Sequence, residues 1–370
     1  MKKIHIQKKY SVLIVICLLM VLINVFSRLC SPFADFYTEK IFPLITNPFS
    51  FISGLLPFSV GEILIILGIL LVTAGIPITV ILLVFGKTFR KKTASVACFV
   101  YLLAFTFVLA TETMNCFIMY QCRPFAEKYL SHSDHTESQI TELYSALIEK
   151  ANTLAEQVPR DSMNCFEFTG DVNPEARRAM KKAGDTFPQL KGYYPKAKPI
   201  QFSYFMSQSH LSGIYFPFSL EANYNDDMCR TNLPETVCHE FSHLKGFIQE
   251  DEANFISFYA TTQCSDDLSF QYSGYLSALE YVHNEIYSQN ITGAFYLTDG
   301  ISDNVRRDWF RFMPDNYWEE NEKKEIIPTE TVSTVSTTAL DTNIKMNGRT
   351  DGIKSYSLMV ELLLDFYYPA

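Results

Sequence analysis

Long uninterrupted apolar runs occur only in the first 112 residues of this 370-residue chain. They cover residues 10–27, 63–86 and 94–111, each close to the roughly 20 residues that a helix needs to cross a bilayer. Lysines precede the first run, as they do in a signal peptide, but no small-residue cleavage site follows it and two further runs come later. We therefore predict three retained transmembrane helices.

After residue 112, the spacing of apolar positions indicates shorter elements. Thr136 and Gln139 have the spacing of a capping box, and the apolar residues that follow predict a helix over 137–157. Asn173 as a cap and Pro174 in the first turn predict a second helix that ends near residue 183. Helices are also expected near residues 277–288 and at the end of the chain, around 360–364.

Two other stretches have different patterns. Apolar residues alternate with others near 200–204 and 214–218, which predicts two strands separated by a turn around Ser212 and Gly213. Between about 320 and 338 the chain is charged and then rich in Thr, Ser and Val, which indicates an exposed loop or a disordered insertion. The whole pattern predicts an α+β fold class, with a membrane domain over 1–112 and a globular domain over 113–370.

Charge is distributed unevenly between these two parts. Residues 1–112 carry ten Lys and Arg against four Asp and Glu, whereas residues 113–370 carry 21 against 36. The dense basic segments near the membrane are the N-terminus and the loop 86–92, and such segments favour the cytoplasmic side. We therefore expect a multi-pass protein of the cell membrane with a cytoplasmic N-terminus and an extracytoplasmic C-terminal domain. The apolar connection 28–62 is expected at the extracytoplasmic interface of the cell membrane.

Composition also argues against nucleic acid as a partner and predicts disulfide bonds. The net charge is −9 and there is no basic patch, so nucleic acid is not expected as a partner. Residues 113–370 contain six of the nine cysteines, an even number in an oxidising compartment, which predicts some disulfide pairing. No CxxC pair of the zinc-binding type occurs.

The stretch TVCHEFSHLKGFIQEDEANFISF, residues 236–258, contains the clearest candidate chemistry. On a helix, His239 and His243 lie one turn apart on the same face, so both imidazoles can reach one metal ion. Glu240 is adjacent and can direct its carboxylate at a water on that ion, as metal-assisted hydrolysis requires. The alternative is an acidic surface helix with two unrelated histidines. We favour a zinc site.

A catalytic zinc site needs a third protein ligand. Glu250 is eleven residues after His239, and on an unbroken helix it would lie ~16 Å away. The helix must therefore break, and Gly246 is the residue type that favours a helix end. We prefer Glu250 to the competing Glu252, because Asn254 lies one turn after Glu250 and can support a ligand.

The residues of this motif resemble those of a known superfamily. His239-Glu240-x-x-His243 followed by Glu250-x-x-Ala253-Asn254 resembles the zincin superfamily, in the branch whose third ligand is a glutamate. The three N-terminal spans, Ser212–Phe218, Glu221–Asn223, the motif itself, Tyr272–Tyr275 and Asp351–Tyr356 together resemble a bacterial family of membrane-anchored, zincin-like proteins of unknown function. The resemblance covers nearly the whole chain. It implies a zincin-like metallopeptidase domain after the membrane region.

The resemblance also implies roles for residues around the motif. The strand before the motif helix, with Tyr215–Phe218 as the candidate, would pair with extended substrate. An oxyanion stabiliser would complete the site, and Tyr356 is favoured over the other candidates, which are Tyr272, Tyr275 and His210. The remaining histidines His132, His135 and His283 have no partners at ligand spacing and are interpreted as surface residues.

The motif and the three spans are compatible with two functions, an enzyme and a sensor or scaffold. The first is a membrane-anchored zinc metallopeptidase that hydrolyses peptide or other amide bonds, with a peptide or protein as substrate, zinc as cofactor and the lipid bilayer as partner. The second is a zincin-fold sensor or scaffold that binds a ligand and signals through its three spans. Glu240 favours the first, because a purely structural zinc site has no use for a base.

Overall fold

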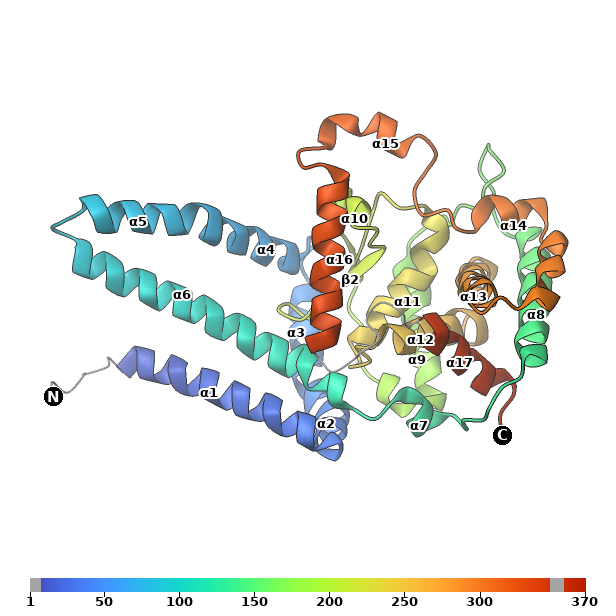
Figure 1. The fold of residues 1–370 in the computed structure, drawn as a ribbon, viewed down its shortest axis with the longest axis horizontal. Coiled ribbons are helices and arrows are strands. Elements are labelled where there is room, and N and C mark those ends of the chain that lie inside the picture. The colour runs from blue at the N-terminus through green and yellow to red at the C-terminus, as the bar shows by residue number, and fades with distance from the viewer. Residues whose placement is uncertain (1–7, 347–355) are drawn as a thin grey trace.

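The computed structural model describes residues 8–346 and 356–370, and within these ranges three helices are long and apolar enough to cross a membrane. They extend from one end of the molecule as an elongated bundle (Figure 1). The first is α1 (Lys8–Leu29). The second, Val60–Phe85, joins α4 (Val60–Leu70) to α5 (Ile76–Phe85), and the third, Arg90–Gln121, begins with α6 (Arg90–Glu112). The three predicted long apolar helices are confirmed, and their exposed apolar side chains indicate association with a membrane.

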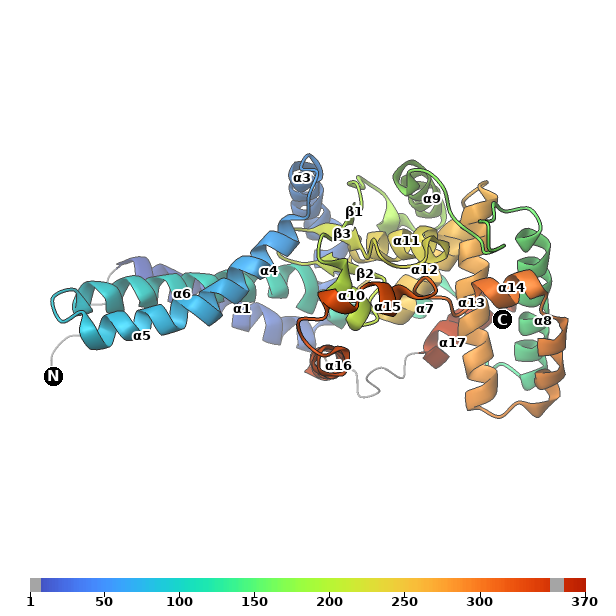
Figure 2. The ribbon, with the colours of Figure 1, turned by 90° about the horizontal axis from the view of Figure 1, so that it is seen from above.

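The connection between the first two spans is helical and lies across the end of the bundle (Figure 2). It contains α2 (Ser31–Phe36), a π-helical segment (Tyr37–Ile41) and α3 (Phe42–Gly54). Phe42 is buried, whereas large apolar side chains further along are exposed: Leu44, Phe49, Phe51, Ile52 and Leu55. This two-sided character fits the prediction that the connection lies in the membrane interface.

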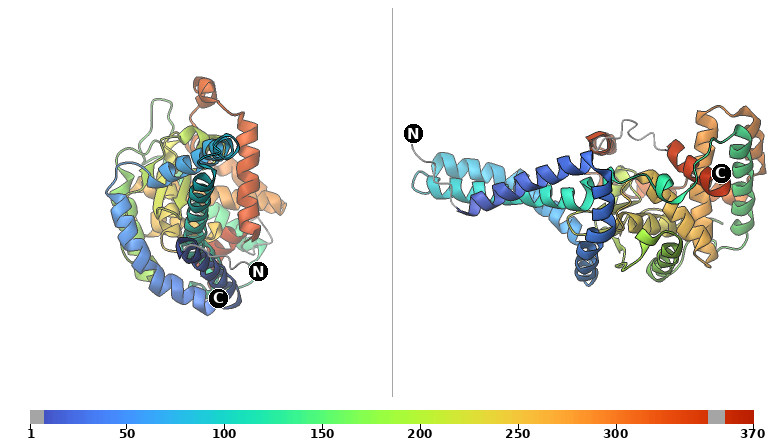
Figure 3. Two further views of the ribbon diagram at one scale, coloured as in Figure 1. Left: turned by 90° about the vertical axis from the view of Figure 1, so that its left-hand side faces the viewer. Right: turned by 90° about the horizontal axis from the view of Figure 1, so that it is seen from below.

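The rest of the chain folds into a mostly helical domain beside the bundle (Figures 1 and 3). Its helices are α7 (Phe125–Tyr129), α8 (Glu137–Ala155), α9 (Val172–Thr186), α10 (Ser203–Gln208), α11 (Leu233–His243), α12 (Glu250–Gln263), α13 (Leu268–Ser288), α14 (Asp303–Asp308), α15 (Tyr317–Glu320), α16 (Thr329–Met346) and α17 (Tyr356–Tyr367). One small sheet has the strands β1 (Lys198–Pro199), β2 (Gly213–Phe216) and β3 (Glu221–Tyr224) in the order β1–β3–β2. The predicted α+β class is therefore only partly right, because the strands are few and short.

The core of the domain lies where α8, α9, α11, α12, α13 and α17 meet. It is rich in buried aromatic side chains, among them Phe241, Phe255, Phe258 and Phe270. The sheet lies on one side of α11, with β2 antiparallel to the central strand β3 and β1 parallel to it. The core thus fixes α11 and α12 against each other, and the sheet covers the remaining face of α11.

Several local predictions can be compared directly with these elements. α8 is confirmed, together with its capping box between Thr136 and Gln139. α9 begins earlier than expected, because the side chain of Asp171, rather than Asn173, accepts the first backbone N–H. The strand predicted over 200–204 is wrong. β1 runs parallel to β3, and Pro199 already pairs with Tyr224, the last residue of β3, so the chain has no strand to pair with after Ile200 and forms α10 instead.

Two further expectations need correction. The exposed loop expected over 320–338 is partly helical: α16 begins at Thr329, whose backbone N–H donates to the side chain of Glu325. The predicted disulfides are not found. All nine cysteines lie within the described residues, and all nine are unpaired thiols.

Candidate metal and catalytic site

The break between α11 and α12 occurs where the sequence predicts it. α11 ends at His243, Gly246 has a φ of +87°, and α12 begins at Glu250 with Gln249 as its cap. An L side chain rarely adopts that φ, and a Cβ at Gly246 would also collide with Thr38 from the π-helical segment before α3. Glycine is therefore needed at this turn for two independent reasons, and the turn brings the start of α12 back toward the end of α11.

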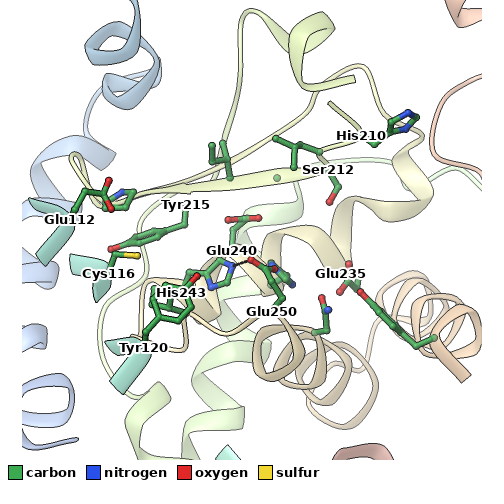
Figure 4. A pocket seen from close by; sticks show the side chains of 18 residues that line it. Glu112, Cys116, Tyr120, His210, Ser212, Tyr215, Glu235, Glu240, His243 and Glu250 are labelled. Carbon is green, nitrogen blue, oxygen red and sulfur yellow. Dashed lines mark ion pairs between the residues drawn. The ribbon is translucent and has the colours of Figure 1, made fainter. Parts of the chain in front are cut away.

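This turn places Glu250 against both histidines of the motif. Figure 4 shows Glu250 close to His243 and Glu240. The distance from Glu250 Oε2 to His239 Nε2 is 3.1 Å, and that from Glu250 Oε1 to His243 Nε2 is 3.9 Å. The ligand atoms of His239, Glu240 and His243 also lie within 4.8 Å of one another. The two imidazole nitrogens therefore have two carboxyl groups within reach, those of Glu240 and Glu250, and two imidazoles with a carboxylate are a donor set that suits zinc.

The backbone orients His243 for such a role. Its Nδ1 lies 2.7 Å from the carbonyl oxygen of Phe247, in the turn after α11. A carbonyl oxygen can only accept a hydrogen bond, so Nδ1 carries the proton and Nε2 keeps its lone pair. That lone pair faces the point where the three side chains converge.

Electrostatics within the cluster follow from burial and from the ion pair. Burial lowers the pKa of His239, but the hydrogen bond to Glu250 outweighs it and raises the pKa to about 10. Burial opposes ionisation of Glu250, and the hydrogen bond from His239 nevertheless lowers its pKa to about 2. Burial lowers the pKa of His243 to about 4. The cluster therefore pairs a protonated His239 with an anionic Glu250, beside a neutral imidazole at His243, and a metal ion bound here would replace the proton on His239 Nε2.

The carboxyl group of Glu240 is buried beside the ion pair of His239 and Glu250. The residue is only 4% exposed, and among the described residues none forms a hydrogen bond with its Oε2. Burial raises its pKa to about 8. A buried carboxylate oxygen without a partner is costly, and such groups are concentrated at functional sites.

Gly213 of β2 lies directly over this carboxylate. A Cβ at Gly213 would come within 2.5 Å of Glu240 Oε1 and 2.8 Å of Thr236 Cγ2. Such separations are far below an ordinary contact, so any side chain here would displace the Glu240 carboxylate. The close approach of β2 to α11 therefore depends on glycine at this position.

A cleft of about 530 Å³ opens above these residues. β2 forms one wall and is an edge strand of the sheet, paired only with β3 among the described residues. The other walls come from the start of α12 and from the end of the third span. Among the described residues that line the cleft there are four glutamates and neither lysine nor arginine: Glu112, Glu235, Glu240 and Glu250. The cleft is therefore acidic, which favours a bound cation.

The competing ligand Glu252 points elsewhere. Its Oε1 accepts the backbone N–H of Phe125 at 2.7 Å, at the start of α7. Asn254 lines the cleft beside Glu250, but among the described residues its side chain makes no hydrogen bond with either histidine. The geometry thus brings together His239, Glu240, His243 and Glu250, and separates Glu252 from them.

Of the candidates for an oxyanion stabiliser, Tyr272 and Tyr275 lie away from the cleft, whereas His210 lines it. The hydroxyl of Tyr272 donates to Asp308 at 2.7 Å, and Tyr275 packs against Phe258 in the core, so neither faces the cleft. His210 does line the cleft, with a φ of +53°. The backbone of Tyr356 begins α17, but its side chain lies outside the described part of the structure, and its proposed role stays a prediction.

Of the three histidines predicted to lie on the surface, only His132 is exposed. His132 is exposed, but the side chain of His135 is just 6% exposed and pairs with Asp365 of α17 at 2.7 Å. His283 is half-buried, with its Nδ1 2.7 Å from the hydroxyl of Tyr144. The predictions for His135 and His283 are wrong because their partners lie more than a hundred residues away in sequence.

Three residues that line the cleft from the third span were not predicted from the sequence: Glu112, Cys116 and Tyr120. They are spaced four residues apart, which places them on one helix face, and this spacing was a signal that they act together. The role of Gly213 was not predicted either, since the alternating pattern indicated only a turn there. The close approach of this glycine to Glu240 exists only in the folded chain.

The comparison with known families gives one match. The family described as "Protein of unknown function (DUF3810)" matches residues 37–364. No curated protein and no solved structure matches the chain. The matched range includes the second and third spans and every residue of the cluster. The predicted relationship to a family of unknown function with N-terminal apolar helices is thereby confirmed, whereas the likeness to zincins stays a prediction.

Proposed function

The chain belongs to the DUF3810 family, and we propose that it is a membrane-anchored zinc-dependent peptidase. The observation that carries the proposal is the convergence of His239 Nε2, His243 Nε2 and the Glu250 carboxylate next to Glu240, whose Oε2 has no hydrogen-bond partner among the described residues. Two histidines and a glutamate suit a catalytic zinc site, since three protein ligands leave one position open. The orphaned Glu240 oxygen supports this further, because a structural metal site does not need a base.

In this proposal His239, His243 and Glu250 hold the zinc ion. When bound, zinc supplies Lewis acidity that polarises a substrate carbonyl and acidifies a water molecule. Glu240 Oε2 accepts a proton from the water as its oxygen attacks the carbonyl carbon, and then delivers that proton to the departing amide nitrogen. Glu240 Oε2 has no hydrogen-bond partner among the described residues, so it can accept that proton.

The substrate lies along β2. The outer edge of this strand faces the cleft, and an extended peptide can add to such an edge through backbone hydrogen bonds. Tyr215 helps to fix the strand, because its ring packs 6.1 Å from that of His243 and its hydroxyl donates to the carbonyl of Asn115. Extended peptide chains fit this arrangement better than compact ligands do. The basic loops still favour a domain that faces away from the cytoplasm.

A second function, that of a sensor or scaffold, is supported by a specific set of contacts. Lys198 of β1 and Glu221 of β3 form a buried ion pair at 2.5 Å. Glu221 also accepts the backbone N–H groups of Val60 and Gly61, the first residues of the second span. The sheet over the cleft is therefore attached directly to a transmembrane helix. A ligand that moved the sheet would act on that span.

One experiment separates the two functions. Full-length wild-type protein, Glu240→Gln and Glu250→Gln are purified, and their zinc content and their cleavage of an unfolded protein such as casein are measured. Glu240→Gln keeps the shape but removes the base, so we expect near wild-type zinc and a cleavage rate lower by a factor on the order of 10²–10⁴. Glu250→Gln should lose zinc, because an amide is a poorer donor than a carboxylate.

Two results would contradict the proposal. If Glu240→Gln lost zinc while Glu250→Gln kept it, the assignment of ligands and base would be wrong. If Glu240→Gln restored every phenotype of a deletion strain, hydrolysis would not be the function, and the sensor would replace the peptidase.

A further inference from the structure

The cleft begins where the third span leaves the membrane. The apolar run of this span ends at Thr111, and the next residue, Glu112, already lines the cleft. Cys116 and Tyr120 follow on the same face. Tyr120 is eight residues after Glu112 along this helical segment, so it lies on the order of 10 Å beyond it. The polar headgroup layer is about 5–8 Å thick on each side of a bilayer, so this wall of the cleft starts at headgroup depth.

The edge strand is held at the same depth. The hydroxyl of Tyr215 donates to the carbonyl of Asn115 at 3.0 Å, and the side-chain amide of Asn115 donates to the carbonyl of Pro217 at 2.6 Å. Asn115 lies in the π-helical segment Thr113–Phe117 that continues the third span. These two bonds join β2 to the end of the span, so the strand cannot move away from the membrane without breaking them.

The helix α3 holds the other side of the sheet. The hydroxyl of Ser50 in α3 donates to the carbonyl of Leu220, in the connection between β2 and β3, at 2.8 Å. The opposite side of α3 and the residue that caps its end expose large apolar side chains: Leu44 is 74% and Leu55 69% exposed. α3 lies between two spans in sequence and across their ends in space (Figure 3), so lipid is the occupant that continues from the spans onto this face.

From these three attachments we infer that the cleft takes peptide segments of membrane-anchored proteins close to their anchor. This inference rests on the proposed peptidase function and names its substrate class. An extended chain advances about 3.3 Å per residue, so about four residues reach from the hydrocarbon edge to the far end of this wall. Lying along β2 takes a few residues more, which places the scissile bond within about ten residues of the anchor. A folded soluble protein cannot bring its backbone to that depth.

The test uses full-length protein reconstituted in vesicles of phosphatidylcholine and phosphatidylglycerol. One casein-derived sequence that the enzyme cleaves is placed about 5 or about 30 residues from a single transmembrane helix, and is also prepared without an anchor. We expect the near substrate to be cleaved about tenfold faster than the far one, because effective concentration falls roughly as the −3/2 power of linker length. A site well above the membrane gives the reverse order, since a spacer of about five residues does not reach it.

The relative cleavage rates test the substrate inference separately from the proposed peptidase function. Equal rates for the near and far substrates, or faster cleavage of the far or soluble one, would overturn the inference and leave the peptidase intact. Cleavage of none of the three forms, nor of casein, would overturn the proposed function and the inference with it.

A second measurement tests the geometry without relying on activity. Leu55→Trp places an indole on the exposed side of α3, and its fluorescence should be quenched by lipids with brominated acyl chains, beyond the quenching seen in wild type. Tyr296→Trp is the matched control, because Tyr296 is 66% exposed on the domain far from the spans. Equal quenching of the two variants would contradict the placement of α3 at the bilayer.

Discussion

Two clusters in this molecule each combine two histidines with a carboxylate. In the first, the histidines lie four residues apart on α11, and both Nε2 atoms face the single carboxylate of Glu250. In the second, His132 and His135 lie in the segment before α8 and pair with Asp365 of α17, at 3.2 Å and 2.7 Å. The first cluster forms the floor of a cleft and has Glu240 beside it, whereas the second joins the end of the chain to the domain.

The difference between the clusters lies in convergence rather than in composition. His132 contacts Asp365 through Nδ1 and His135 through Nε2, whereas both histidines of the first cluster present Nε2 to Glu250. The Glu250 side chain is 42% exposed to the cleft, and Glu240 Oε2 has no hydrogen-bond partner within the described part of the chain. Spacing on one rigid helix is what aims two imidazoles at one point.

The largest expected effect is on metal binding. His243→Ala should reduce the zinc content of the purified protein from about one ion per chain to nearly none, and abolish casein cleavage, because two remaining ligands hold zinc poorly. The metal is measured by mass spectrometry after dialysis. His132→Ala is the matched control and should keep its zinc. Loss of zinc in His132→Ala, or its retention in His243→Ala, would reverse the assignment of the two clusters.

A smaller effect is expected from the contact that positions Glu240. Gly213→Ala would put a methyl group within 2.5 Å of the Glu240 carboxylate, so that carboxylate must move. We expect casein cleavage to fall by a factor on the order of 10–100, at unchanged zinc content, since small displacements of a reacting group cost this much. Gly293→Ala is the control, because nothing lies within 4 Å of the added methyl group. Unchanged cleavage in Gly213→Ala would show that Glu240 is not held by β2.

The second cluster should affect stability instead of activity. Asp365→Asn removes a buried carboxylate that pairs with His132 and His135, and we expect the free energy of unfolding to fall by about 1–3 kcal/mol. The measurement is the midpoint of denaturant unfolding followed by circular dichroism, with zinc content and cleavage unchanged. Asp134→Asn, at an exposed neighbouring carboxylate, should leave the midpoint in place. A loss of zinc in Asp365→Asn would mean that the two clusters are coupled.

The smallest expected effect is a pH dependence of the second cluster. Asp365 raises the pKa of His132 above its ordinary value of 6.5, mainly through their hydrogen bond. A pKa raised by folding means that the stabilisation is fully present below about pH 6.5 and is lost as pH rises through the higher, folded-state pKa. The stability difference between wild type and His132→Ala should therefore be larger at low pH and shrink above neutrality. A difference that grew with pH would contradict the ion pair.

The sequence by itself determined the elements whose signals are local. Apolar runs long enough to cross a bilayer located the three spans, the Thr136–Gln139 capping box located α8, and Gly246 located the end of α11. The spacing of His239 and His243 placed them on one face, because a helix has a fixed period. Even the return of Glu250 followed from a local argument, since no straight helix could bring it within reach.

Only the tertiary structure decided which distant segments meet these elements. The alternating pattern over 200–204 favoured a strand, but β3 ends at Tyr224, opposite Pro199, and left it no partner. The approach of Gly213 to Glu240, the pairing of His135 with Asp365 and the cleft wall formed by the third span all join residues far apart in the chain. Local propensity does not encode such contacts, because they depend on how whole elements pack, and that packing places the cleft at the membrane.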